Sequence, residues 1–147
     1  MYSQHFGFEE KPFDVTPNPK FIYASQAHRE ALASLIYGIK ERRGFIVLVG
    51  EVGTGKTLLL NTALDHLEEE VKTAYIYNTK ATFDQFMTLA LADFGIAQAT
   101  DTLSQVDIIY RLNQFAIKQL TNNGNVVLII DEAQNLLPDD LEKIRLL

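Results

Sequence analysis

Three runs of apolar residues along the chain predict three β-strands. Residues 45–49 and 125–130 are nearly continuous apolar runs rich in β-branched residues, and residues 73–77 form a similar short run. Strands that are buried on both faces of a parallel sheet have this composition, whereas strands with one face in water alternate apolar and polar residues. The pattern therefore predicts a sheet built from these three segments.

The segments between these runs carry apolar residues at helical spacing. A helix over about residues 26–42 is indicated by apolar positions at 31, 32, 35, 36 and 39, with Ser25 as its N-cap. Thr82 and Gln85 have the spacing of a capping box, which opens a helix that ends near residue 94. Further helices are predicted over about residues 58–69 and 103–120, and a last one begins at Pro138.

The order of these elements predicts the fold class. Strands and helices alternate as β-α-β-α-α-β-α, which favours an α/β fold with a parallel sheet and helices on both faces. Residues 1–24 differ from the rest because they hold most of the prolines and several aromatic residues, so we interpret them as an extended N-terminal arm. Residues 25–147 then form the core domain.

Composition narrows the class of protein. The chain has 147 residues, 47% of them hydrophobic, which is typical of one globular domain. Its net charge of −6 gives no overall footprint for nucleic acid, and the absence of Cys excludes disulfides and Cys-based metal sites. No signal peptide and no apolar run of about 20 residues is found, so the sequence predicts a cytoplasmic chain without membrane contact.

Residues 50–57 fit the pattern of a phosphate-binding loop at every required position. The loop lies between a predicted strand and a predicted helix, where backbone N–H groups and the helix N-terminus favour phosphate. Lys56 is predicted to reach the β- and γ-phosphates, and the Thr57 hydroxyl to ligate Mg²⁺. The nucleotide-binding residues predicted here are Gly50, Glu51, Val52, Gly53, Thr54, Gly55, Lys56, Thr57 and Leu58.

An acidic pair follows the third predicted strand. Asp131 stands at the carboxyl end of residues 125–130, where a Walker-B Asp holds the Mg²⁺ shell in P-loop NTPases. Glu132 is predicted to act as the catalytic base that polarises the attacking water. Together with the phosphate loop, the pair indicates ATP hydrolysis with Mg²⁺, rather than a small GTPase or a nucleotide kinase.

These motifs resemble those of AAA+ ATPases, and the N-terminal stretch is similar to the general secretion pathway protein A family. The latter similarity rests on residues 6–8, 11–13, 16–19, 21–23 and 28–32. The family includes related ATPases of pilus biogenesis and exopolysaccharide export. The resemblance implies a homo-oligomer that works with secretion or envelope-assembly proteins, with inner-membrane contact through segments beyond those seen here.

The resemblance also implies roles for residues outside the two motifs. Phe21, Ile22 and His28 correspond to positions that wrap the adenine; the alternative is aromatic packing and a surface histidine. Asn78, at the end of the second predicted strand, corresponds to a polar residue that holds the catalytic Glu inactive; the alternative is a strand-ending Asn favoured by turn chemistry.

Parts of an AAA+ protein that follow the Walker-B strand are not recognised in this sequence. They are the sensor-1 strand, the arginine finger, the sensor-2 arginine and the helical lid. The sequence therefore looks like an AAA+ core cut off after the Walker-B region, and we expect these 147 residues alone to be poorly active.

Three functions are compatible with the sequence. The first is an ATPase that energises or assembles a secretion or cell-surface polymer system. The second is a DNA-associated AAA+ regulator, such as a transposition helper ATPase. The third is a nucleotide-binding switch that hydrolyses ATP poorly and acts through oligomerisation. The acidic composition and the N-terminal stretch favour the first.

Overall fold

A computed structural model describes residues 5–7, 24–67, 70–77 and 80–147 of the chain. The chain divides into two compact units, Met1–Leu67 and Glu68–Leu147. Most of the predicted N-terminal arm lies outside the described residues.

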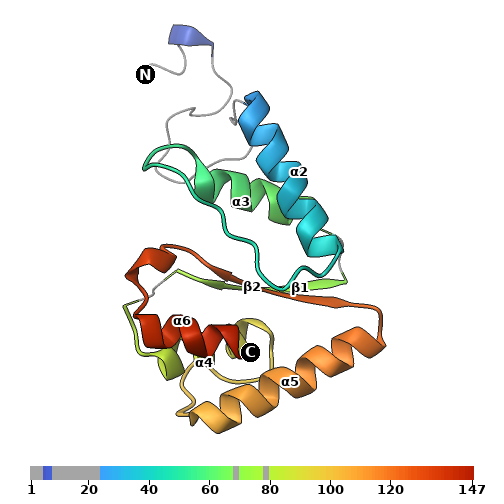
Figure 1. Ribbon diagram of the computed structural model, residues 1–147, viewed down its shortest axis with the longest axis vertical. Helices are drawn as coiled ribbons and strands as arrows, with labels where there is room; N and C mark the ends of the chain where they lie inside the picture. Colours follow the sequence, from blue (N-terminus) through green and yellow to red (C-terminus); the bar gives the residue numbers. More distant parts are fainter. Residues whose placement is uncertain (1–4, 8–23, 68–69, 78–79) are drawn as a thin grey trace. The chain divides into compact units, whose positions relative to one another are not determined.

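The first unit is built on two helices that pack against each other, α2 (Gln26–Lys40) and α3 (Lys56–Asp65) (Figure 1). Helix α2 starts where the sequence predicts, because the Ser25 side chain accepts a hydrogen bond from the His28 N–H. The small core between the helices is formed by Leu35, Leu59 and Ala63, with Leu48 packed against it. The apolar faces of the two helices therefore meet as the periodicity requires.

The strand predicted over residues 45–49 is not formed, and this prediction is wrong. The segment between α2 and α3 runs without regular structure, and its side chains are largely exposed, Val47 by 80% and Val49 by 84%. A strand is held by ladder hydrogen bonds to a neighbour. Within the described part of this unit, no other strand is present to supply them. An apolar run favours an extended backbone but cannot provide its own partner.

The second unit contains a parallel sheet of two strands, β1 (Val71–Ile76) and β2 (Asn125–Ile130) (Figure 1). The register pairs Val71 with Asn125 and Ile76 with Ile130. The connection between the strands includes α4 (Phe83–Asp93) and α5 (Gln105–Thr121), as a parallel pair demands. The strand predicted over 125–130 is confirmed, and the one predicted over 73–77 begins two residues earlier.

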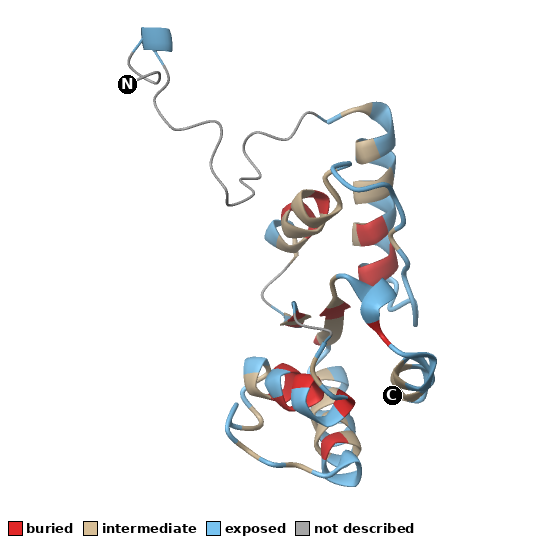
Figure 2. Cartoon of the chain, turned by 90° about the vertical axis from the view of Figure 1, so that its left-hand side faces the viewer, coloured by how far each residue is buried: buried red, intermediate tan, exposed pale blue. Residues whose placement is uncertain are grey.

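The core of the second unit lies between one face of the sheet and the helices. Alternate strand residues face it, and side chains of α4 and α5 fill the space, with Met87, Leu91 and Ile108 fully buried. Figure 2 shows the buried residues of the chain in red. The core comprises Ala74, Ile76, Phe83, Phe86, Met87, Ala90, Leu91, Ile108 and Leu136. This packing fixes the carboxyl ends of both strands relative to α4 and α5.

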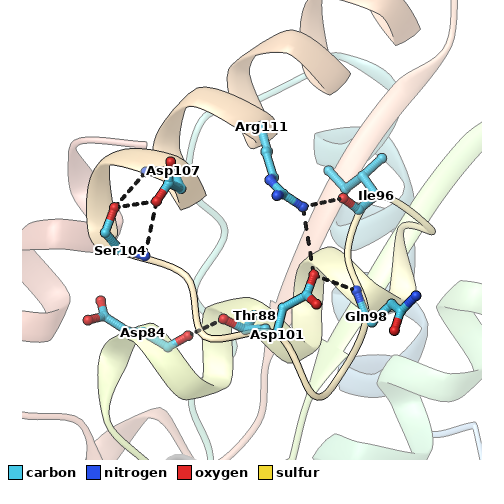
Figure 3. Close-up of polar contacts among 8 residues, drawn as sticks. All are labelled: Asp84, Thr88, Ile96, Gln98, Asp101, Ser104, Asp107 and Arg111. Carbon is cyan, nitrogen blue, oxygen red and sulfur yellow. Dashed lines mark hydrogen bonds and ion pairs between the residues drawn. The ribbon is translucent and has the colours of Figure 1, made fainter.

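Local hydrogen bonds close the loop between α4 and α5 (Figure 3). The Arg111 guanidinium donates to the Ile96 carbonyl at 3.2 Å and lies 3.8 Å from the Asp101 carboxylate, which also accepts from the Gln98 N–H.

After β2 the chain forms a short 3-10 turn at Ala133–Asn135 and then α6 (Pro138–Arg145), which starts at the predicted proline.

Candidate functional site

The phosphate loop has the backbone geometry that its glycines predict. Gly53 and Gly55 both have φ of +82°, a left-handed conformation that residues with a Cβ resist. A Cβ at Gly50 would lie only 2.9 Å from the Thr54 hydroxyl oxygen, so a larger residue there would force the Thr54 side chain to shift. The loop is therefore shaped by three glycines in a way that most substitutions would disturb.

Helix α3 begins at Lys56, directly after the left-handed Gly55 that forms its N-cap. No side-chain hydrogen bond caps this end, and the helix dipole adds partial positive charge there. Thr57 and Leu58 follow in the first turn and are partly buried. This is the arrangement that binds phosphate in other nucleotide sites.

The loop is braced by its own side chains. The Thr54 hydroxyl donates to the Glu51 carbonyl at 2.8 Å, and the Lys56 ammonium donates to the carbonyls of Gly50 and Glu51 at 2.8 and 2.9 Å. Val52 is fully exposed at the tip. A bound phosphate would have to compete for the Lys56 ammonium with these two carbonyls.

The acidic pair lies at the carboxyl end of β2. The Asp131 N–H donates to the Ile76 carbonyl at 3.1 Å, which places Asp131 beside the end of β1. Its carboxylate accepts from the Glu132 N–H at 2.9 Å and from the Tyr75 hydroxyl at 3.0 Å. The predicted metal ligand is thus held at the predicted edge of the sheet.

Glu132 is the predicted catalytic base, and its backbone is unusual. Its φ of +53° lies in the left-handed region, which costs a residue with a Cβ on the order of 1 kcal/mol. Its exposed carboxylate accepts a hydrogen bond from the Gln134 side-chain amide. Gln134 therefore contacts the predicted base.

Sequence reasoning missed Tyr75. Burial raises the pKa of its phenol, and the hydrogen bond to Asp131 and the charge of that carboxylate raise it further, so the hydroxyl stays a donor. The ring also stacks on Tyr77, with centroids 4.0 Å apart. One feature of the sequence could have identified Tyr75: it lies near the end of a predicted strand that runs parallel to the strand preceding Asp131.

The structure brings the predicted residues together in two groups. The phosphate loop and His28, whose ring nitrogen lies 2.9 Å from the Thr54 carbonyl oxygen, belong to the first unit. Asp131 and Glu132 belong to the second. Phe21, Ile22 and Asn78, whose roles the resemblance implied, lie outside the described residues.

The donors present suit Mg²⁺ held partly by phosphate. The part of the chain that the structure describes has no group of three or more His, Asp or Glu side chains that could hold a metal ion. Mg²⁺ commonly takes one or two protein oxygen ligands and completes its shell with water and substrate phosphates. The Thr57 hydroxyl in the first unit and the Asp131 carboxylate in the second are each an oxygen group of that kind. In the same described residues, no helix is long and apolar enough to cross a membrane.

Comparison with known proteins identifies the family. A family model described as AAA domain matches residues 39–147, which include both the phosphate loop and the acidic pair. The chain belongs to the AAA family. This confirms the resemblance to AAA+ ATPases and the α/β P-loop fold class, to which the parallel pair β1–β2 and its helices conform.

The chain is also similar over its whole length to a curated protein. The chain is 39% identical over 148 residues to "General secretion pathway protein A" of Aeromonas hydrophila. The alignment covers all of this chain and 27% of the relative, so the chain spans about a quarter of that protein's length. No solved structure matches the chain.

Proposed function

We propose that this AAA domain binds Mg·ATP and hydrolyses it, within a protein that energises or assembles a secretion or cell-surface polymer system. The geometry of the phosphate loop carries the proposal: left-handed Gly53 and Gly55 lead into a helix that begins with Lys56 and has no side-chain hydrogen bond at its N-terminus. The similarity to a general secretion pathway protein supports the choice of process. Partners would be secretion or envelope-assembly proteins and further copies of the chain.

Each residue of the site has a proposed role. Lys56 would neutralise charge on the β- and γ-phosphates, and Thr57 and Asp131 would supply oxygen atoms to Mg²⁺. Glu132 would accept a proton from the attacking water. The proposed contacts of Phe21 and Ile22 with adenine, and of Asn78 with the catalytic base Glu132, rest on the family resemblance.

The alternative function is a DNA-associated regulator built on the same core. The net charge of −6 disfavours it, because proteins that bind DNA without sequence preference do so through basic surfaces. Binding of the complete protein to duplex DNA that weakens steeply with salt would support the alternative. Absence of such binding at low salt would favour the secretion proposal.

Hydrolysis by the complete protein tests the proposal. Glu132→Gln keeps the shape of the side chain but removes the base, so we expect ATP binding with turnover reduced at least ~10²-fold. Glu41→Gln, at an exposed position after α2, is the matched control and should leave turnover unchanged. Turnover near the wild-type rate in Glu132→Gln would show that water is activated by another group.

A further inference from the structure

His28 links the start of α2 to the phosphate loop. It stands in the first turn of the helix, and its two ring nitrogens make separate contacts. Nδ1 lies 2.6 Å from the Ser25 hydroxyl oxygen, and Nε2 lies 2.9 Å from the Thr54 carbonyl oxygen. All three residues belong to the unit Met1–Leu67. A residue 26 positions earlier in the chain thus contacts the loop directly.

The partners determine where the ring hydrogen lies. A carbonyl oxygen can only accept, so Nε2 must carry the hydrogen that it donates to Thr54. In the neutral ring Nδ1 then accepts from the Ser25 hydroxyl. The Ser25 oxygen also accepts from the His28 N–H at 3.3 Å. Ser25 therefore caps the helix and orients the imidazole in one arrangement.

The contact with Thr54 fixes one peptide of the loop. The peptide unit is planar and trans, so the Thr54 carbonyl and the Gly55 N–H point to opposite sides of it. Holding the oxygen against His28 therefore directs the Gly55 N–H away from the histidine. Gly55 has no Cβ to restrict rotation, and a Cβ built there would lie 3.7 Å from Nε2. A hydrogen bond from outside the loop therefore restricts a peptide that could otherwise rotate.

Among the described residues, further hydrogen bonds in this region come from the loop itself and from the first residue of α3. The Thr54 hydroxyl and the Lys56 ammonium both bond to loop carbonyls. The His28 contact differs because it ties the loop to α2, whose packing on α3 is fixed by the core of the unit. Both ring nitrogens are engaged, so the imidazole in this arrangement offers a nucleotide base only its faces.

We propose that His28 is a positioning residue that holds the phosphate loop in its phosphate-binding form through the Thr54 carbonyl. The proposal rests on the proposed function, since it concerns the same nucleotide site. It assigns His28 to the phosphate part of the ligand rather than to adenine. Loss of the contact should weaken the binding of every ligand that carries the phosphate chain, whatever nucleotide base is attached.

Binding of Mg·ATP, Mg·GTP and magnesium tripolyphosphate to the complete protein tests this assignment. We expect His28→Ala to lower the affinity for all three ligands by a similar factor of about three to ten, which corresponds to the loss of one ordinary hydrogen bond. His28→Gln places an N–H donor near the position of Nε2 and should restore most of the affinity. His28→Asn reaches only as far as Nδ1 and should not.

His66→Ala is the matched control. His66 also bonds a backbone carbonyl, that of Thr62 at 2.7 Å, but at the other end of α3, so its loss should leave affinity unchanged. Unchanged affinity in His28→Ala, a loss confined to ATP, or equal behaviour of the Gln and Asn variants would overturn the proposal. If His28→Ala does not fold, the comparison of Gln with Asn decides. Failure of the wild-type protein to bind any of the three ligands would instead refute the proposed function.

Discussion

Both carboxylate oxygens of Asp131 accept hydrogen bonds from the protein. One bond comes from the next backbone N–H and the other from the Tyr75 hydroxyl, which is fixed in turn by stacking on Tyr77. These two bonds orient the carboxylate group at the end of β2. Tyr75 is thus a support for the predicted metal ligand.

The contact predicts a measurable loss in stability. Tyr75→Phe keeps the aromatic stack and removes the donor to Asp131, so we expect the free energy of unfolding in urea to fall by about 1 kcal/mol. Tyr77→Phe removes an exposed hydroxyl from the same stack and should change stability little. Equal stability of the two variants would show that the Tyr75 hydroxyl contributes nothing to the fold.

Helices and strands whose formation is determined by nearby residues in the sequence agree best with the predicted bounds. Thr82 and Gln85 form the expected capping box of α4, and β2 has the predicted bounds. The segment 45–49 fails because its strand depends on a partner, and an apolar run does not identify that partner. Helix α5 carries a second capping box, Ser104 with Asp107, which the sequence analysis did not recognise (Figure 3).

This capping box predicts a dependence of stability on pH. The Ser104 hydroxyl, and then its N–H, hold the pKa of Asp107 below its usual value, so ionised Asp107 is favoured in the folded state. Its contribution is complete above the ordinary pKa, about 3.9, and is lost as the pH falls through the lowered pKa. We expect Asp107→Asn to lower the melting temperature at pH 7. We also expect the melting temperature of this variant to fall less than that of the wild type between pH 7 and about pH 3.

The control for this effect is Asp84→Asn. Asp84 also lies in the first turn of a helix, but it bonds Thr88 through its backbone carbonyl. The difference in melting temperature between wild type and Asp84→Asn should therefore change less with pH. A wild-type pH profile in Asp107→Asn would contradict the role given to the carboxylate.

For the whole molecule, the sequence identified the two motifs but not the contacts between residues far apart in the chain. The phosphate loop and the acidic pair were found from spacing, because backbone geometry and charge require those residues at those positions. The contacts from His28 to Thr54 and from Tyr75 to Asp131 join residues 26 and 56 positions apart. No local pattern specifies such pairs, since they follow from how helices and strands pack.

Titration of the complete protein with Mg·ATP tests the central claim most directly. We expect saturable binding by the wild-type protein. Lys56→Ala should weaken it at least ~10-fold, because a hydrogen bond to a charged group contributes about 1.5–3 kcal/mol. Lys118→Ala, an exposed lysine of α5, is the control and should bind as wild type does. Equal affinity for Mg·ATP in the wild-type and Lys56→Ala proteins would contradict the assignment of residues 50–57 as the nucleotide site.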